Sequence, residues 1–306
     1  MNLGDYVRLY SDGQYNKISS YMDFNKNKLD LTNENYSQWK LATQKIIPSF
    51  NENGINYVLI KYIQIPFIKL NDVDILIENE NDITDAINIL KNKNYYLFRD
   101  RYSINKNKIT AMSKNSKIQV DIYPKSTWFN MRYAPDNLIT SHKISKELFD
   151  FETYVPDPTL DAYIIATHSY NHGTISLAEA VYFCKIIKEN FIDWRLLTRI
   201  STKYYLNHAL ILYLILTNFY FGDKYQIYFD KIISNFNNNY ITKIYSSWIY
   251  SQRKNKFPLI LPYSLRLLSS LSRLFHKFNS NDVQTYDELL GYSLALIHRN
   301  NRKISV

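Results

Sequence analysis

The sequence predicts an α+β protein in which a small mixed β-sheet with flanking helices is followed by an all-α C-terminal domain. Short runs of β-branched and aromatic residues recur between residues 57 and 123, and helical apolar patterns dominate after Pro158. Runs of strands followed by runs of helices are typical of α+β folds or of two domains. We therefore divide the 306 residues into an N-terminal helical segment (1–50), an α/β core (51–155) and a helical domain (156–306).

Two helices are expected in the N-terminal half. Residues 36–50 repeat apolar side chains at helical spacing, and residues 82–91 form a second amphipathic pattern. Asn81 or Asp82 is the expected N-cap of the second helix, because each short polar side chain can accept a hydrogen bond from a backbone N–H of the first turn.

The strands are expected around these helices. Runs rich in β-branched and aromatic residues predict strands at 57–61, 72–77, 95–102, 108–112 and 117–123. The polar breaks at 105–107 and 114–116 are short. Short breaks favour antiparallel hairpins among the last three strands.

The chain after Pro158 is expected to be almost entirely helical. Apolar residues recur there at intervals of three and four, and the predicted helices cover 160–169, 177–188, 194–200, 206–219, 241–250, 265–275 and 286–297. The single cysteine, Cys184, lies in an apolar run and is expected to be a buried small side chain.

Composition narrows the environment and the partners. A single cysteine permits no intrachain disulfide, which favours a reducing cytoplasm. The N-terminus has no apolar signal-peptide core, and the longest apolar stretch, residues 209–221, is shorter than the roughly 20 residues that cross a bilayer. A net charge of +9 and a pI of about 9.2 suit a nucleotide, a nucleic acid or an acidic surface. The lysines are spread along the chain, so a solvated basic surface is the alternative.

Three acidic residues lie opposite aliphatic residues on two of the predicted strands. Asp72 and Asp74 alternate with aliphatic residues at the start of one strand, and Asp121 lies between Val120 and Ile122 on another. Because side chains alternate between the faces of a strand, each strand has an aliphatic face and an acidic face. The alternative is that these are ordinary surface acids, since Asp-x-Asp alone is a common pattern.

A divalent metal site follows if these two strands pair in one sheet. Three adjacent carboxylates repel one another, and cations relieve that repulsion. Mg²⁺ or Mn²⁺ is the natural occupant, because both ions prefer oxygen ligands. Two such ions about 4 Å apart support in-line attack at phosphorus. Asp72 and Asp74 would hold both ions, while Asp121 would bind the ion at the nucleophile and accept its proton.

This segment resembles the nucleotidyltransferases of the DNA-polymerase-β type. That superfamily places Asp-x-Asp on one strand and a third acid, often between aliphatic residues, on a later strand. The motifs Asp72-Val73-Asp74 and Val120-Asp121-Ile122 occur here in that order with a helix between them. The resemblance covers residues 50–125 and is greatest to an uncharacterised branch with a helical C-terminal region. It implies a metal-dependent enzyme that uses a nucleoside triphosphate (NTP) as its substrate.

The stretch before the acidic strand departs from the family. The branch often carries an aliphatic-Lys-Gly sequence, and the corresponding residues here are Ile60, Lys61 and Tyr62. Lys61 fits a contact with the phosphates of the nucleotide, the alternative being an ordinary lysine at a strand end. Tyr62 replaces a small residue that lets the backbone approach phosphate. We expect this replacement to alter nucleotide binding or to abolish it.

Two other pairs of polar residues are candidate ligands. His168 and His172 are four residues apart and would share one face of a helix. Gly173 suggests that this helix ends there. No acid lies between them as in a metalloprotease, so packing, capping or a contact with substrate is favoured over zinc. Arg99 and Arg101 could contact a triphosphate or an RNA backbone, but a solvated strand face is favoured.

The sequence therefore predicts an enzyme that transfers a nucleoside monophosphate from an NTP to a hydroxyl of a small molecule, protein or RNA. The basic charge favours an anionic acceptor, and tRNA is one candidate. The alternative is a catalytically degenerate module of the same fold that binds a nucleotide or a partner.

Overall fold

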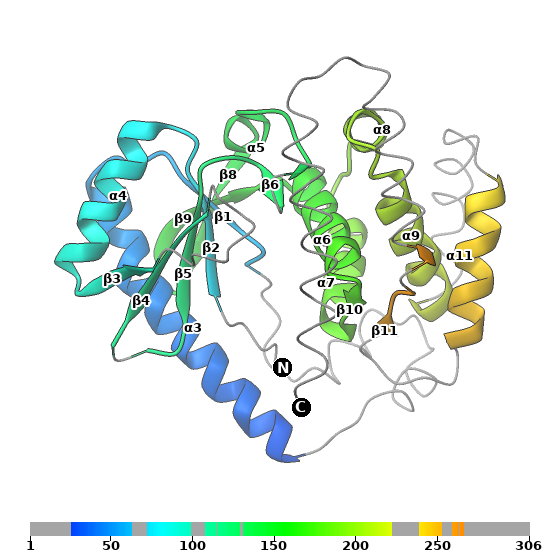
Figure 1. Ribbon diagram of the computed structural model, residues 1–306, viewed down its shortest axis with the longest axis horizontal. Helices are drawn as coiled ribbons and strands as arrows, with labels where there is room; N and C mark the ends of the chain where they lie inside the picture. Colours follow the sequence, from blue (N-terminus) through cyan, green and yellow to red (C-terminus); the bar gives the residue numbers. More distant parts are fainter. Residues whose placement is uncertain are drawn as a thin grey trace. The chain divides into compact units, whose positions relative to one another are not determined.

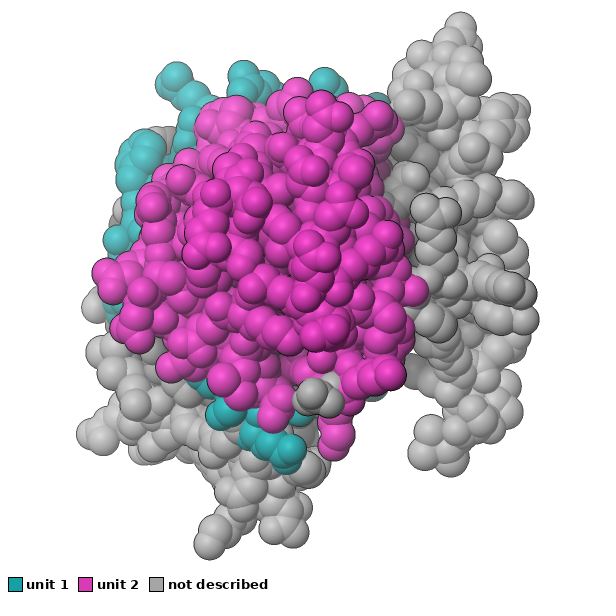
Figure 2. Space-filling model, turned by 90° about the vertical axis from the view of Figure 1, so that its left-hand side faces the viewer, with its two compact units in different colours: residues 1–37, 61–70, 156–269 teal, residues 38–60, 71–155, 270–306 magenta. Residues whose placement is uncertain are grey.

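The computed structural model describes residues 26–62, 72–98, 108–114, 116–128, 131–221, 239–252, 259–262 and 264–265. The chain forms two compact units, which Figure 2 shows in different colours. The sheet unit comprises residues 38–60, 71–155 and 270–306, and the helical unit comprises residues 1–37, 61–70 and 156–269. Arg99, Arg101, the predicted helix at 286–297 and all but the first residue of the predicted helix at 265–275 lie outside the described residues.

The sheet unit is built on a small mixed sheet of five strands in the order β1-β2-β5-β4-β3 (Figure 1). Their bounds are Val58–Ile60, Asp72–Leu76, Gln119–Tyr123, Ile109–Ser113 and Tyr95–Phe98. β2 and β5 are parallel, and the other neighbours are antiparallel. The mixed sheet and the antiparallel pairing among the last three strands agree with the sequence prediction.

One face of this sheet is apolar and supports two helices. Val73, Ile75, Val120 and Ile122 are fully buried, as their alternation with the acidic residues predicts. In Figure 1, α4 (Glu80–Asn92) and the part of α3 (Lys26–Glu52) that belongs to this unit lie along one side of the sheet. Burial of these aliphatic side chains is the main stabilisation of the sheet, at about 25 cal/mol per Å² of apolar surface.

The helix α3 is fixed to the strand that carries the first two acids. Trp39 is 2% exposed, and its indole Nε1 donates a 3.0 Å hydrogen bond to the backbone carbonyl of Asp72. Phe50, near the other end of the helix, is fully buried and packs edge-on against Tyr57 with ring centroids 5.8 Å apart. The entry of β2 into the sheet is therefore held by side chains from a neighbouring helix.

The N-cap of α4 is Asn79, so the prediction of Asn81 or Asp82 is wrong. The Oδ1 atom of Asn79 accepts hydrogen bonds from the backbone N–H groups of Asn81 and Asp82, at 2.8 and 3.4 Å. The Asp82 carboxylate instead accepts the backbone N–H of Asn56 at 3.2 Å. Which of the neighbouring Asn and Asp residues becomes the N-cap depends on where the preceding strand ends and the helix begins. The local sequence does not specify that position.

The segment after β5 contains elements that the sequence did not predict. They are β6 (Thr127–Trp128), β7 (Met131–Arg132), α5 (Leu138–Ser141), β8 (Lys143–Leu148) and β9 (Phe151–Pro156). The hairpin of β8 and β9 turns at Phe149 and Asp150, whose φ angles are +56° and +72°. Glycine or asparagine usually marks such a turn, and neither residue is present here.

The helical unit contains five of the predicted helices, and Figure 1 labels them α6, α7, α8, α9 and α11. Their bounds are Pro158–His172, Leu177–Glu189, Trp194–Lys203, Asn207–Phe221 and Asn239–Ser251. α6 begins at the N-cap Asp157 and ends at Gly173, whose φ of +68° is the left-handed conformation that favours glycine. The end near Gly173 and the burial of Cys184 confirm the sequence prediction.

Two short strands also belong to the helical unit, so its described part is not purely helical. β10 (Thr174–Ile175) follows α6 directly and pairs with β11 (Leu259–Ile260). Two residues are too few for the period-2 pattern that predicts strands. Among the described residues, no helix combines the length and the apolar character needed to cross a membrane.

The assignment of the α4 cap predicts different effects for two neighbouring asparagines. Asn79→Ala should lower the free energy of unfolding by about 1 kcal/mol, because two N–H groups of the first turn lose their acceptor. Asn81→Ala should change it by less than about 0.5 kcal/mol, as for an ordinary surface substitution. Urea unfolding of both variants measures this difference, and equal effects would contradict the assignment.

Candidate metal centre

Three carboxylates gather on the polar face of the sheet. Asp74 on β2 lies directly beside Asp121 on β5 in the parallel register, and Asp72 lies two residues earlier on the same face of β2. Each residue offers a carboxylate oxygen, and these three oxygens all lie within 4.8 Å of one another. The structure thus brings together the three acidic residues that the sequence selected, in a group that could hold a metal ion.

The carboxylates differ in exposure. Asp121 is fully buried, Asp74 is 5% exposed and Asp72 is partly exposed. A buried carboxylate is stable only when polar partners or a cation compensate its lost hydration. The cluster is therefore open to solvent on the Asp72 side and closed around Asp121.

The polar partners of Asp121 come from the neighbouring strand β4. The hydroxyl of Thr110, which lies opposite Asp121 in the β4–β5 register, donates a 2.6 Å hydrogen bond to its Oδ1. The Nζ atom of Lys108 lies 2.7 Å from its Oδ2, and the Lys108 side chain is 26% exposed. Both oxygens of Asp121 therefore have a donor, and the ammonium of Lys108 neutralises one of the three negative charges.

Two tyrosines respond to the negative charge of this cluster. Burial raises the pKa of Tyr123 well above its usual value, and the charges of the three carboxylates raise it further. Burial also raises the pKa of Tyr133, with additional contributions from Asp74 and Glu78. Both phenols therefore stay protonated, and a protonated phenol can donate a hydrogen bond to a carboxylate.

The donor set fits a hard divalent cation. Carboxylate oxygens are the preferred protein ligands of Mg²⁺, and Mn²⁺ accepts the same set. A cation at this place would oppose the mutual repulsion of the three acids. It would also compete with the Lys108 ammonium for Asp121, because both bind the same carboxylate. The affinity for metal therefore depends on how strongly Lys108 is held.

Lys61 and Tyr62 follow β1 immediately and belong to the helical unit. Lys61 has a φ of +56°, which residues other than glycine rarely adopt. Its contact with phosphate stays a prediction. Tyr62 is 4% exposed and packs edge-on against Tyr182, with ring centroids 6.2 Å apart. The Tyr62 side chain is thus part of the core of the helical unit.

Burial governs the ionisation of this tyrosine pair as well. Desolvation raises the pKa of Tyr62, and the negative charge of Asp161 raises it further. Asp161 is 1% exposed and accepts a 2.8 Å hydrogen bond from the Tyr182 hydroxyl. Tyr62 therefore lies in a buried environment shared with the Tyr182 phenol and the Asp161 carboxylate.

Sequence reasoning missed Lys108, Thr110 and the two tyrosines that border the acids. Thr110 is found only when the hairpin register is known, since that register places it opposite Asp121. Lys108 lies just before β4, where a long side chain can reach across to the neighbouring strand. The polar break at 114–116 locates the turn of this hairpin, but it does not specify the observed register, in which Met112 pairs with Gln119.

Comparison of the chain with models of protein families, with curated proteins and with solved structures gave no match. The geometry and the chemistry of the acidic cluster are therefore the basis for inferring a function.

Competition between Lys108 and the metal gives a first test of the centre. Lys108→Met should increase the affinity for Mn²⁺ about tenfold, because a hydrogen bond to a charged group is worth about 1.5–3 kcal/mol and each 1.4 kcal/mol is about a factor of ten. Titration followed by the electron paramagnetic resonance signal of unbound Mn²⁺ measures the affinity.

Lys114→Met is the matched control, because Lys114 follows β4 at its other end and is exposed. This variant should bind Mn²⁺ like the unmodified protein. Weaker binding after Lys108→Met, with the control unchanged, would mean that Lys108 supports the metal and does not compete with it.

Proposed function

We propose that the chain is a metal-dependent nucleotidyltransferase that transfers a nucleoside monophosphate from an NTP to a hydroxyl acceptor. The observation that carries the proposal is the parallel pairing of β2 with β5, which sets Asp74 beside Asp121 and Asp72 next to both. Two strands separated by a helix and bearing Asp-x-Asp and a third acid are the arrangement that the resemblance to the polymerase-β type implies.

The residues of the chain have separate tasks in this reaction. The acceptor oxygen attacks the α-phosphorus, the bond from that phosphorus to the bridging oxygen breaks, and pyrophosphate leaves. Two Mg²⁺ ions would supply activation of the hydroxyl and stabilisation of the leaving group. Asp72 and Asp74 would hold both ions, and Asp121 would hold the one at the acceptor and accept its proton.

The environment of Asp121 bears on its role as the base. Thr110 donates a hydrogen bond to its Oδ1, and the Lys108 ammonium lies against its Oδ2. A cation bound to Oδ2 of Asp121 would displace the Lys108 ammonium from that oxygen. Lys108 would then be available to contact a phosphate as a mobile point charge.

Two further features support this proposal. Lys61 lies next to the strand that pairs with the Asp72–Leu76 strand, and its left-handed φ is the kind of backbone strain that clusters at ligand sites. The net charge of +9 favours an anionic acceptor, of which tRNA is one candidate.

The second candidate is a catalytically degenerate module that binds a nucleotide or a partner. Tyr62 favours it, because a buried tyrosine replaces the small residue that would let the backbone approach phosphate. The Lys108–Asp121 ion pair also favours it, because an ammonium can replace a metal as the partner of a buried carboxylate. The two candidates share a fold and differ in whether a nucleoside monophosphate is transferred to an acceptor.

A transfer assay separates the candidates. The protein is incubated with NTPs labelled at the α-phosphate, Mg²⁺ and cell extract, and labelled acceptors are separated by electrophoresis or chromatography. The enzyme should transfer label, and Asp74→Asn or Asp121→Asn should reduce transfer at least about 100-fold, since loss of a metal ligand removes charge stabilisation of the transition state.

Asp85→Asn is the matched control, because Asp85 is an exposed acid on the helix between the two acidic strands. It should transfer label like the unmodified protein. Absence of transfer together with retained NTP binding would support the degenerate module. Equal transfer by the Asp74, Asp121 and Asp85 variants would exclude the acidic cluster as the catalytic site.

A further inference from the structure

A second group of metal-ligand side chains lies in the helical unit. His168 and His172 are four residues apart near the C-terminal end of α6, and their rings are 4.2 Å apart between centroids with a 58° angle between the ring planes. Residues at this spacing lie on one face of a helix. The two imidazoles thus form a compact pair carried by a single element of regular structure.

Both histidines are partly exposed on a helix that is mostly buried. Every residue from Thr159 to Asn171 except His168 is buried, and His168 and His172 are each partly exposed. The His168 side chain is 24% exposed. Solvent therefore reaches both side chains, which are not enclosed in the core as their neighbours on the helix are. The one polar, solvent-accessible part of the helix consists of two imidazoles.

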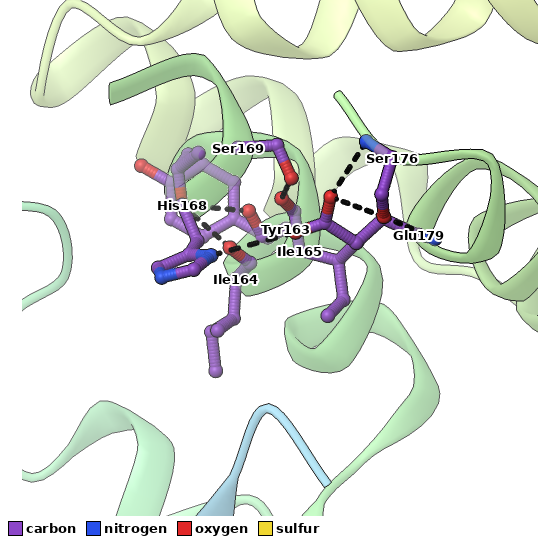
Figure 3. A network of polar contacts seen from close by, with 8 residues as sticks. Tyr163, Ile164, Ile165, His168, Ser169, Ser176 and Glu179 are labelled. Carbon is purple, nitrogen blue, oxygen red and sulfur yellow. Dashed lines mark hydrogen bonds and ion pairs between the residues drawn. The ribbon is translucent and has the colours of Figure 1, made fainter. Parts of the chain in front are cut away.

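The carboxylate of Glu179 lies close to the imidazole of His168. The Nδ1 atom of His168 lies 3.7 Å from Oε1 of Glu179, and Figure 3 shows the two side chains facing each other. The negative charge at this position favours a proton on Nδ1, which leaves the lone pair on Nε2. A carboxylate that faces the second nitrogen of a histidine is the usual support of a metal-binding imidazole.

Glu179 is itself held in place by the start of the next helix. Its Oε2 accepts hydrogen bonds from the backbone N–H of Ser176 at 2.9 Å and from the Ser176 hydroxyl at 2.7 Å (Figure 3). The Ser176 side chain in turn accepts the backbone N–H of Glu179 at 3.1 Å, which completes a capping box. The carboxylate is therefore fixed before any ligand binds, which lowers the entropic cost of orienting His168.

We propose that His168 and His172 bind a divalent transition metal ion such as Zn²⁺ or Ni²⁺. His168 binds through Nε2, His172 supplies the second imidazole, and Glu179 orients His168 from behind. Two imidazoles select borderline metals, whereas the three carboxylates of the sheet unit suit hard ions. The remaining coordination positions belong to water or to a further ligand. This site does not depend on nucleotidyl transfer, so either proposal can fail without the other.

The test is a calorimetric titration of the full, untagged chain with Ni²⁺ in the presence of excess Mg²⁺, which fills the hard-ion site. One equivalent of Ni²⁺ should bind. His168→Ala and His172→Ala should each weaken binding at least about tenfold, as expected when one of two ligands is lost. Glu179→Gln, which keeps an amide able to close the capping box, should weaken it by about tenfold, at the lower end of the range for an orienting partner.

His142→Ala is the matched control, because His142 is exposed and belongs to the sheet unit. This variant should bind Ni²⁺ like the unmodified chain. Thermal unfolding provides an independent readout: Ni²⁺ should raise the Tm of the unmodified chain and of the control, and should not raise that of His168→Gln, which keeps a polar side chain at a partly exposed position.

Three results would overturn the proposal. The first is the absence of Ni²⁺ binding to the unmodified chain. The second is binding that persists in His168→Ala and His172→Ala but is lost in Asp74→Asn, which would assign the ion to the acidic cluster. The third is equal loss in the His142 control, which would indicate nonspecific binding to histidines.

Discussion

The in-register parallel pairing of β2 with β5 is the constraint on which the candidate metal centre depends. A slip of one residue would turn every side chain of one strand to the opposite face. Asp121 would then replace Val120 in the apolar layer, and the three acids could not meet. The fully buried Val73, Ile75, Val120 and Ile122 prevent this slip, and the hydrogen bond from the Ile77 N–H to the Tyr123 carbonyl continues the pairing by one step. The hydrophobic core therefore places the polar site.

The same geometry imposes a cost, because carboxylates with little exposure are crowded together. Thr110 and Lys108 offset that cost at Asp121 with hydrogen bonds of 2.6 and 2.7 Å. These contacts stabilise the fold without a metal, and the ammonium also opposes metal binding. The Asp121 carboxylate can therefore bind either of two cations, the Lys108 ammonium or a divalent metal ion. Under the proposed function, the partner that prevails at cellular metal concentrations would decide between the enzyme and the degenerate module.

The sequence predicted much of this arrangement because alternation along strands and helical periodicity are local properties. Asp72, Asp74 and Asp121 could be selected because each lies opposite an aliphatic face, and that face needs no knowledge of the partner strand. Lys108 and Thr110 could not be selected in this way, since their contact with Asp121 follows from the register of a hairpin. The Asn79 cap and the turn at Phe149 and Asp150 were missed for a related reason: several residue types satisfy such positions, and tertiary packing chooses among them. The burial of Tyr62 likewise results from tertiary contacts with residues distant in sequence, such as Tyr182, and the local sequence does not reveal it.

The most direct measurement of the central claim is anomalous diffraction from crystals of the protein soaked in Mn²⁺ and a non-hydrolysable NTP. The account predicts Mn²⁺ peaks at about 2.0–2.3 Å from oxygens of Asp72, Asp74 and Asp121, close to the distances known for hard divalent ions, with Lys108 displaced from Asp121. A soaked crystal with no Mn²⁺ peak at these carboxylates, and with Lys108 still bonded to Asp121, would contradict it.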